Sequence, residues 1–207
     1  MHNLTFLCRI LASTTHEMQN ILAIIKESGA LVGDVLNLNG PPRMKHGDKL
    51  FSALGTVEAQ VERGRALMTA INTCAHAAAA EYEVLELPVF CDRAAVLSER
   101  MVRLKECSLK VVKGLDKARL RADGFDFLQT VCRAVELALA GCQAGDELTL
   151  VLQTAEKGQA LVRVASDTAR SVPQSDAEFD AMTARIGAQL RLEAGALSLI
   201  VPLASGA

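Results

Sequence analysis

The sequence predicts an α+β protein in which an N-terminal antiparallel helical hairpin precedes a two-layer α/β sandwich. Apolar or small residues recur every three or four positions through most of residues 4–80, the spacing of amphipathic helices. After residue 82, short segments of alternating polarity are interleaved with helical patterns, which is typical of helices packed on a mostly antiparallel sheet. We therefore predict two domains, 1–82 and 83–207.

The first predicted helix covers residues 4–38. Its apolar stripe advances in alternating steps of three and four residues, which keeps one side of a helix against a partner. The stripe consists of Leu11, Thr14, Met18, Ile21, Ile25, Ser28, Val32 and Val35. The Asn, Gly and paired Pro residues of 37–42 should end this helix and turn the chain.

The second predicted helix begins at Asp48, a candidate N-cap, and continues to Ala80. The short connection makes the two helices an antiparallel pair. The second stripe consists of Leu50, Leu54, Val57, Val61, Gly64, Met68, Ile71 and Ala75. Because further apolar residues flank both stripes, we expect two copies of the hairpin to form a dimeric four-helix bundle. The alternative is a two-helix layer packed on the C-terminal half of the same chain.

In the second domain, periodicity predicts three helices and six strands. The helices cover 92–105, 125–142 and 177–192, and the strands cover 83–90, 108–114, 117–121, 148–152, 160–165 and 196–203. The turn 155–158 makes the fourth and fifth strands a hairpin. The inward residues of the first of these helices should be Ala95, Leu97, Met101 and Leu104.

Composition excludes several classes of function. The chain has 207 residues, of which 50% are hydrophobic, so it can bury a sizeable core. A net charge of -2 and an aromatic content of 3% give no reason to expect nucleic acid or an anionic membrane as a partner. Arg9, His16 and Glu17 interrupt the apolar N-terminus too early for a signal peptide or a membrane span.

The six cysteines lie apart, without any Cys-x-x-Cys pair, and most fall on apolar stripes. We therefore expect reduced core residues in a cytoplasmic protein rather than disulfides or metal ligands.

The candidate site is the sequence His16-Glu17-Met18-Gln19-Asn20 in the first helix. His16 lies two residues past one stripe position and two before the next, so it should point to solvent, with Glu17 beside it and Asn20 one turn on. A zinc helix would need a second imidazole at position 20, which is Asn. The alternative is an ordinary exposed histidine on a scaffold helix.

The pattern His-Glu-x-x-Asn before an apolar run resembles the H-box of two-component histidine kinases and their phosphotransferase relatives. The resemblance implies that His16 is phosphorylated, that Glu17 assists proton transfer and orients the ring, and that Asn20 positions the attacking group or a water. The order of elements after residue 82 is similar to the ATP-binding domain of these kinases. Three segments carry this second resemblance, namely 126–131, Asp167 and 195–203.

The resemblance also shows what the second domain lacks. Ala134 and Ala138 stand where the family has its Mg²⁺-coordinating Asn, and the glycine box reads Asp167-Thr168-Ala169-Arg170-Ser171 without its glycines. The lid shrinks to 170–176, and Gly187 is left within the last helix. Alanine gives Mg²⁺ no oxygen ligand, and only glycine allows backbone to approach phosphate so closely. We expect a degenerate ATPase-like domain that resembles the ChpT-like histidine phosphotransferases.

The function implied is a phosphorelay step in which His16 takes a phosphoryl group from the Asp of a response-regulator receiver domain and passes it to another receiver. The chain itself should need no cofactor, because the receiver brings Mg²⁺. The partners expected are a second copy and receiver domains. The docking face should include Cys8, Leu11, Ala12, Thr15, Arg63, Ala66, Leu67 and Ala70. The alternatives are an autokinase with a divergent nucleotide site, a non-catalytic pseudokinase, and a plain dimeric scaffold.

Overall fold

The computed structural model describes residues 2–39, 47–79, 82–156, 158–169 and 171–204. Backbone contacts divide the chain into two compact units, Met1–Thr69 and Ala70–Ala207. This division falls within the second helix. The boundary predicted from the sequence, at residue 82, marks the end of the helical hairpin and stays a prediction.

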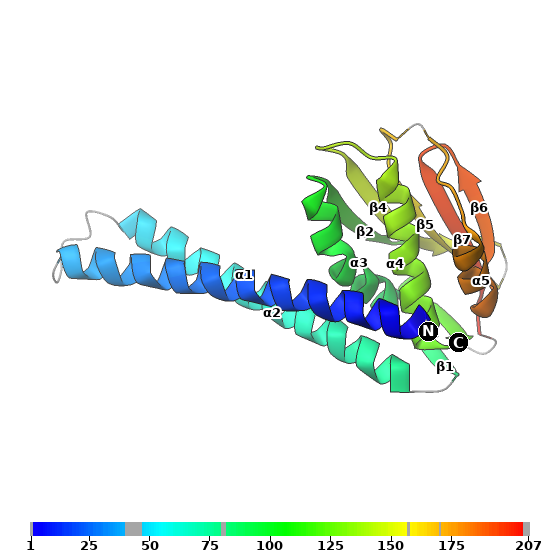
Figure 1. Ribbon diagram of the computed structural model, residues 1–207, viewed down its shortest axis with the longest axis horizontal. Coiled ribbons are helices and arrows are strands. Elements are labelled where there is room, and N and C mark those ends of the chain that lie inside the picture. The colour runs from blue at the N-terminus through cyan, green and yellow to red at the C-terminus, as the bar shows by residue number, and fades with distance from the viewer. Residues whose placement is uncertain (1, 40–46, 80–81, 157, 170, 205–207) are drawn as a thin grey trace. The chain divides into compact units, whose positions relative to one another are not determined.

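The first unit consists of α1 (His2–Asn39) and most of α2 (Gly47–Ala79), so both predicted helices are confirmed (Figure 1). They are antiparallel and packed together, since an ion pair joins Glu17 to Arg63 and a Cβ on Gly64 would lie 3.6 Å from Ile21 Cγ2. The turn predicted over 37–42 lies mostly outside the described residues, and so does the side chain of Asp48.

The buried stripe of α1 differs from the predicted one near the candidate site. Ile10, Thr14, Glu17 and Ile21 are each no more than 9% exposed, whereas Leu11, which we expected to be inward, is 54% exposed. The reason is that Glu17 enters the helix interface to meet Arg63. In α2, four members of the predicted stripe are likewise exposed, namely Leu54, Val61, Met68 and Ala75.

The second unit is an α+β sandwich, as predicted, and its larger sheet is mixed. Its elements are β1 (Glu83–Glu86), α3 (Leu87–Leu104), β2 (Ser108–Lys113), β3 (Arg119–Ala122), α4 (Gly124–Ala140), β4 (Glu147–Thr154), β5 (Gln159–Ala165), α5 (Ala177–Arg185), β6 (Gln189–Glu193) and β7 (Ala196–Pro202). The larger sheet has the order β2-β4-β5-β7-β6, and β1 pairs with β3 in a separate antiparallel ribbon. Only the β2–β4 pairing of the larger sheet is parallel.

Helices α3, α4 and α5 lie on one face of the larger sheet (Figure 1). Every second side chain of β4 and β5 faces these helices, and these side chains form the core between the helices and the sheet. The buried residues of these two strands are Leu148, Leu150, Leu152, Ala160, Val162 and Val164. From the helices, Phe127 and Phe179 are completely buried.

The first strand of this unit is shorter than predicted. It ends at Glu86, and the next residues form the first turn of α3 rather than the end of a strand. Pro88 is compatible with that turn because the first N–H groups of a helix have no partner within the helix. At the other end of α3, Leu104 is 68% exposed and was wrongly expected to face inward, while Val102 is buried.

The last helix is also shorter than predicted. It ends at Arg185, and residues 189–193 form β6, which pairs with β7. Gly187 follows the helix with a φ of 67°, the left-handed conformation that ends many helices at little cost for glycine. The helical pattern over 177–192 therefore included a strand that the sequence analysis missed.

Cysteine burial follows the expectation in part. Cys74, Cys91, Cys132 and Cys142 are buried, whereas Cys8 is exposed. Burial raises the pKa of the Cys91 thiol to about 12, with a further contribution from nearby Asp92, so this thiol stays protonated at neutral pH.

Candidate functional site

His16 lies on α1 with its side chain exposed, as expected, and Asn20 is exposed one turn further on. The residues on either side are held by the helix interface: Thr14 is 8% exposed and donates its hydroxyl to the carbonyl oxygen of Ile10 at 2.6 Å, and Glu17 is 4% exposed. The imidazole therefore projects into solvent from a stretch of backbone that is anchored before and after it.

Glu17 was expected beside His16 at the exposed surface, and that expectation is wrong. Its Oε1 lies 2.7 Å from Nη2 of Arg63 on α2, and its side chain is only 6% exposed, against 25% for Arg63. A buried carboxylate needs such a partner because burying an unpaired charge costs several kcal/mol. Arg63 is thus a residue of the site that sequence reasoning placed only on the docking face.

The ion pair also fixes which part of α2 lies level with His16. We expected residues 63–70 of α2 to lie roughly level with His16, and the contact of Arg63 with Glu17 confirms this for Arg63. The docking residues expected on α1, Cys8, Leu11, Ala12 and Thr15, are all exposed. On α2, however, Leu67 is 6% exposed and Ala70 completely buried, so these two do not belong to an accessible face.

In the second unit, the two alanines of α4 that the resemblance places at a metal-ligand position are buried in the core. Ala134 is completely buried and Ala138 is 5% exposed. The helix begins at a well-formed cap, because Oδ1 of Asp123 accepts from the backbone N–H groups of Phe125 at 2.8 Å and Asp126 at 3.0 Å. The residues at the implied Mg²⁺ position do not fit that ion, since a methyl group offers no oxygen.

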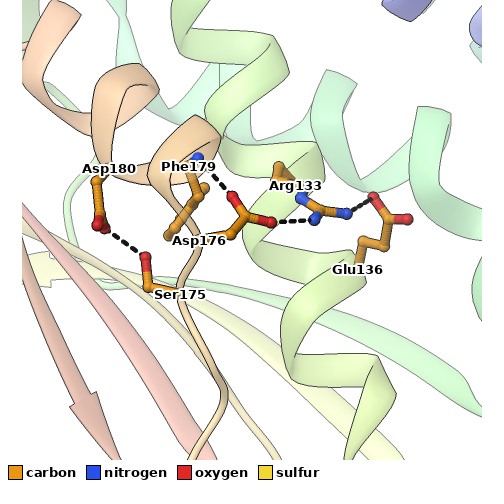
Figure 2. Close-up of polar contacts among 6 residues, drawn as sticks. All are labelled: Arg133, Glu136, Ser175, Asp176, Phe179 and Asp180. Atoms are coloured by element: carbon orange, nitrogen blue, oxygen red, sulfur yellow. Dashed lines mark hydrogen bonds and ion pairs between the residues drawn. The ribbon is translucent and has the colours of Figure 1, made fainter.

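The segment before α5 is fastened to α4 by charged side chains. Arg133 bridges Asp176 at 2.7 Å and Glu136 at 2.8 Å (Figure 2). A second pair joins Arg185 of α5 to Asp126 of α4 at 2.9 Å.

Asp176 is also the N-cap of α5. Its Oδ1 accepts from Phe179 N at 2.8 Å. The pKa of this carboxyl is lowered, first by the Phe179 N–H and then by the Arg133 guanidinium. In the same segment, the Ser175 hydroxyl donates to the Asp180 carboxylate.

The loop that replaces the glycine box packs on the turn between β6 and β7. Ser166 N donates to Gly195 O at 2.8 Å, and Gly195 N donates to Ser171 O at 2.9 Å. Gly195 has a φ of 70°, and a Cβ there would overlap the carbonyl oxygens of Ser166 and Ala169. Only glycine fits this close approach. Asp167, the proposed equivalent of the adenine-contacting residue, is exposed in this loop.

Within the described ranges, no group of three or more His, Cys, Asp or Glu side chains could hold a metal ion. Among the same residues, none of the helices has the length and apolarity needed to cross a membrane.

No protein-family model and no curated protein matches this sequence. Among solved structures, the chain is similar to the mycobacterial sensor histidine kinase MprB, with 14% identity over 59% of this chain and 97% of that one, and a TM-score of 0.49. It is similar to the Acinetobacter baumannii histidine kinase AdeS, with 11% identity over 91% of this chain and 98% of that one, and a TM-score of 0.48.

A third similar structure is full-length ShkA in complex with AMPPNP, with 14% identity over 91% of this chain and 46% of that one, and a TM-score of 0.49. This chain therefore spans less than half the length of the ShkA chain.

Proposed function

We propose that this protein is a histidine phosphotransferase of a two-component phosphorelay, with His16 as the phosphoryl carrier between receiver domains. The observation that carries the proposal is the exposed imidazole of His16 directly before the buried Glu17–Arg63 pair. An acceptor for a phosphoryl group held on another protein must be accessible to a large partner and fixed in direction. The anchored surface of α1 meets both conditions.

The transfer step uses the neutral imidazole as nucleophile. The ring nitrogen without hydrogen attacks phosphorus, the bond from phosphorus to the aspartyl oxygen breaks, and the receiver carboxylate leaves with the electron pair. The other ring nitrogen keeps its hydrogen during attack and then releases the proton to water. The reverse step returns the phosphoryl group to the Asp of a second receiver. An exposed histidine suits this chemistry because imidazole is a competent nucleophile and the receiver can reach the ring.

The second unit supports phosphotransfer rather than an ATP-dependent kinase. Ala134 and Ala138 offer no ligand for Mg²⁺, and the loop at Asp167 is hydrogen-bonded to the Gly195 turn rather than open for phosphate. We propose that this unit is a degenerate ATPase-like domain without a cofactor, and that the receiver supplies Mg²⁺.

Exposed apolar residues on both helices support a homodimer as the working form. On α2, Leu54, Val61 and Met68 recur every seven residues and are 44–50% exposed. On α1, Leu22 and Leu36 are 58–59% exposed and fall on one face, since 14 residues are close to four whole turns. A second copy would cover these stripes in a four-helix bundle.

Phosphoryl labelling tests the proposal. The protein is first charged with labelled phosphoramidate, a small donor whose P–N bond breaks to release ammonia as the phosphorus bonds to histidine. It is then mixed with Mg²⁺ and each receiver domain of its source organism. We expect acid-labile label on His16 that moves to at least one receiver and none in His16→Ala, while His76→Ala, at another exposed helical histidine, behaves as wild type. Transfer by His16→Ala, or transfer to none of the receivers, would overturn the proposal.

A further inference from the structure

We infer that Arg63 is a positioning residue for His16, and that the Glu17–Arg63 pair sets the direction in which α1 presents the imidazole. The inference rests on the proposed function, because it concerns delivery of His16 to a receiver. In this role Glu17 is one half of an ion pair between the two helices. Because Glu17 and His16 are adjacent on α1, the direction of one side chain determines the direction of the other.

The geometry of an α-helix links the two side chains. Successive residues are rotated by about 100° around the helix axis. Glu17 is directed at α2 by its 2.7 Å contact with Arg63, so His16 is directed roughly a quarter turn away from the interface, into solvent. Any roll of α1 that removes Glu17 from the interface moves His16 by the same angle.

A competing roll is available to this sequence. The observed interface contains Ile10 and Glu17, whereas a roll of about half a residue step, roughly 50°, would bring in Leu11 and Met18. Leu11 is 54% exposed in the observed arrangement, so the competing interface would be more apolar. Hydrophobic burial alone favours the competing roll, and the ion pair opposes it.

The pair therefore acts on specificity more than on stability. A buried ion pair gains little net free energy over well-packed apolar side chains, because desolvating both charges offsets their attraction. A polar contact inside a helix interface can nevertheless select one register, since every other register separates the two charges.

The same level of the interface is closely packed. Gly64, the residue after Arg63, is buried, and a Cβ on it would lie 3.6 Å from Ile21 Cγ2. The Ile21 side chain, one turn beyond Glu17, therefore packs against the Gly64 backbone of α2 at ordinary van der Waals distance.

Two donors separate positioning from intrinsic reactivity. Phosphoramidate is small and reaches an exposed ring from any side, so its reaction with His16 depends little on helix roll. A receiver must dock before its Asp meets the ring, so its reaction depends on direction. Loss of the pair should affect the second reaction and spare the first.

The variants compared are Arg63→Ala, Arg63→Lys, the exchanged pair Glu17→Arg with Arg63→Glu, and the apolar pair Glu17→Met with Arg63→Leu. The matched control is Arg65→Ala, whose side chain is 78% exposed and pairs with Glu62 on the same helix. Thermal unfolding of each variant reports whether the hairpin remains folded, and the apolar pair keeps the interface filled if Arg63→Ala does not fold.

We expect Arg63→Ala and the apolar pair to be labelled by phosphoramidate within about twofold of wild type, while transfer to a receiver falls by about tenfold or more in kcat. The exchanged pair should recover part of that loss, and Arg65→Ala should match wild type in both reactions.

Three results would overturn the inference while leaving the proposed function intact, provided that His16→Ala is inactive. The first is wild-type transfer by a folded Arg63→Ala or Arg63→Lys variant. Arg63→Ala removes the charge that pairs with Glu17, and Arg63→Lys changes the geometry of that pair. The second is wild-type transfer by the apolar pair, which would mean that the ion pair only joins the helices. The third is an equal loss in both reactions, which would mean that Arg63 acts on the chemistry of the ring. Transfer by His16→Ala would instead remove the proposed function itself.

Discussion

The guanidinium of Arg133 on α4 lies 2.7 Å from the carboxylate of Asp176, the residue that caps α5. One aspartate therefore ends an irregular segment, starts a helix and joins that helix to its neighbour. The Arg185–Asp126 pair repeats the connection one helix length further along. The segment that would serve as a lid in a nucleotide-binding relative is here tied at its C-terminal end.

Removing Asp176 should destabilise the second unit. Asp176→Ala deletes both the cap bond from Phe179 N and the contact with Arg133, and loss of an N-cap typically costs about 1 kcal/mol. Urea unfolding should show this loss. Asp116→Ala, at an exposed aspartate between β2 and β3, is the matched control and should change the free energy of unfolding by less than about 0.5 kcal/mol.

The contribution of the Asp176 charge should disappear in acid. Because the folded-state pKa of Asp176 is lowered, its stabilising effect is present above the unfolded-state pKa and is lost as the pH falls through the folded-state pKa. The stability difference between wild type and Asp176→Asn should thus be constant near pH 7 and shrink below about pH 4. A difference that grows on acidification would contradict this assignment.

Mg-ATP should not bind the protein measurably. The two positions of α4 where the resemblance implies a metal ligand are Ala134 and Ala138, whose methyl groups are buried and offer no oxygen ligand. Titration calorimetry checks this, with an ATP-binding histidine kinase core as the positive control. A micromolar dissociation constant would show that another set of residues binds the nucleotide.

A single charge on the exposed stripe of α2 should prevent dimer formation. Val61 is 50% exposed, and Val61→Glu would place a carboxylate in the middle of the proposed bundle, where burying it without a partner is costly. Sedimentation should show a dimer for wild type and a monomer for this variant. Val84→Glu, at a β1 valine that is 52% exposed, provides the control and should remain dimeric.

Asn20 should influence loss of phosphate to water more than transfer. It is exposed one turn from His16, where an amide can hold a water in line with a receiver phosphoryl group. Asn20→Ala should transfer at nearly the wild-type rate and reduce hydrolysis of the receiver phosphate, whereas Glu17→Ala should slow transfer by up to about 10²-fold. Following label on both proteins over time distinguishes the two variants, and equal behaviour of both would contradict separate roles.

Local patterns predicted most elements of the fold because they depend on residues that are close in sequence. The long stripes identified α1 and α2, and the alternation around Leu150 and Val162 identified the β4–β5 hairpin. Strand β6 was missed because 177–192 also fits a helical pattern, and its pairing with β7 is a tertiary contact. Propensity is a weak prior wherever such contacts decide the outcome.

The candidate site was predictable only in part for the same reason. The exposure of His16 follows from its place between stripe positions. The burial of Glu17 does not, because it depends on Arg63 from the other helix of the hairpin. A charged residue at the border of an apolar stripe, with an opposite charge at the matching level of the partner helix, is the signal that would have suggested the pair.

The Gly195 turn has a consequence for how this unit can bind a partner. Its backbone hydrogen bonds to Ser166 and Ser171 order both ends of the loop that contains Asp167. Ordering a residue costs about 1–2 kcal/mol of conformational entropy, and here that cost is met during folding. A protein that docks against Ser166 or Ser171 would therefore meet backbone that is already hydrogen-bonded, and less of its binding free energy would go into ordering these two residues.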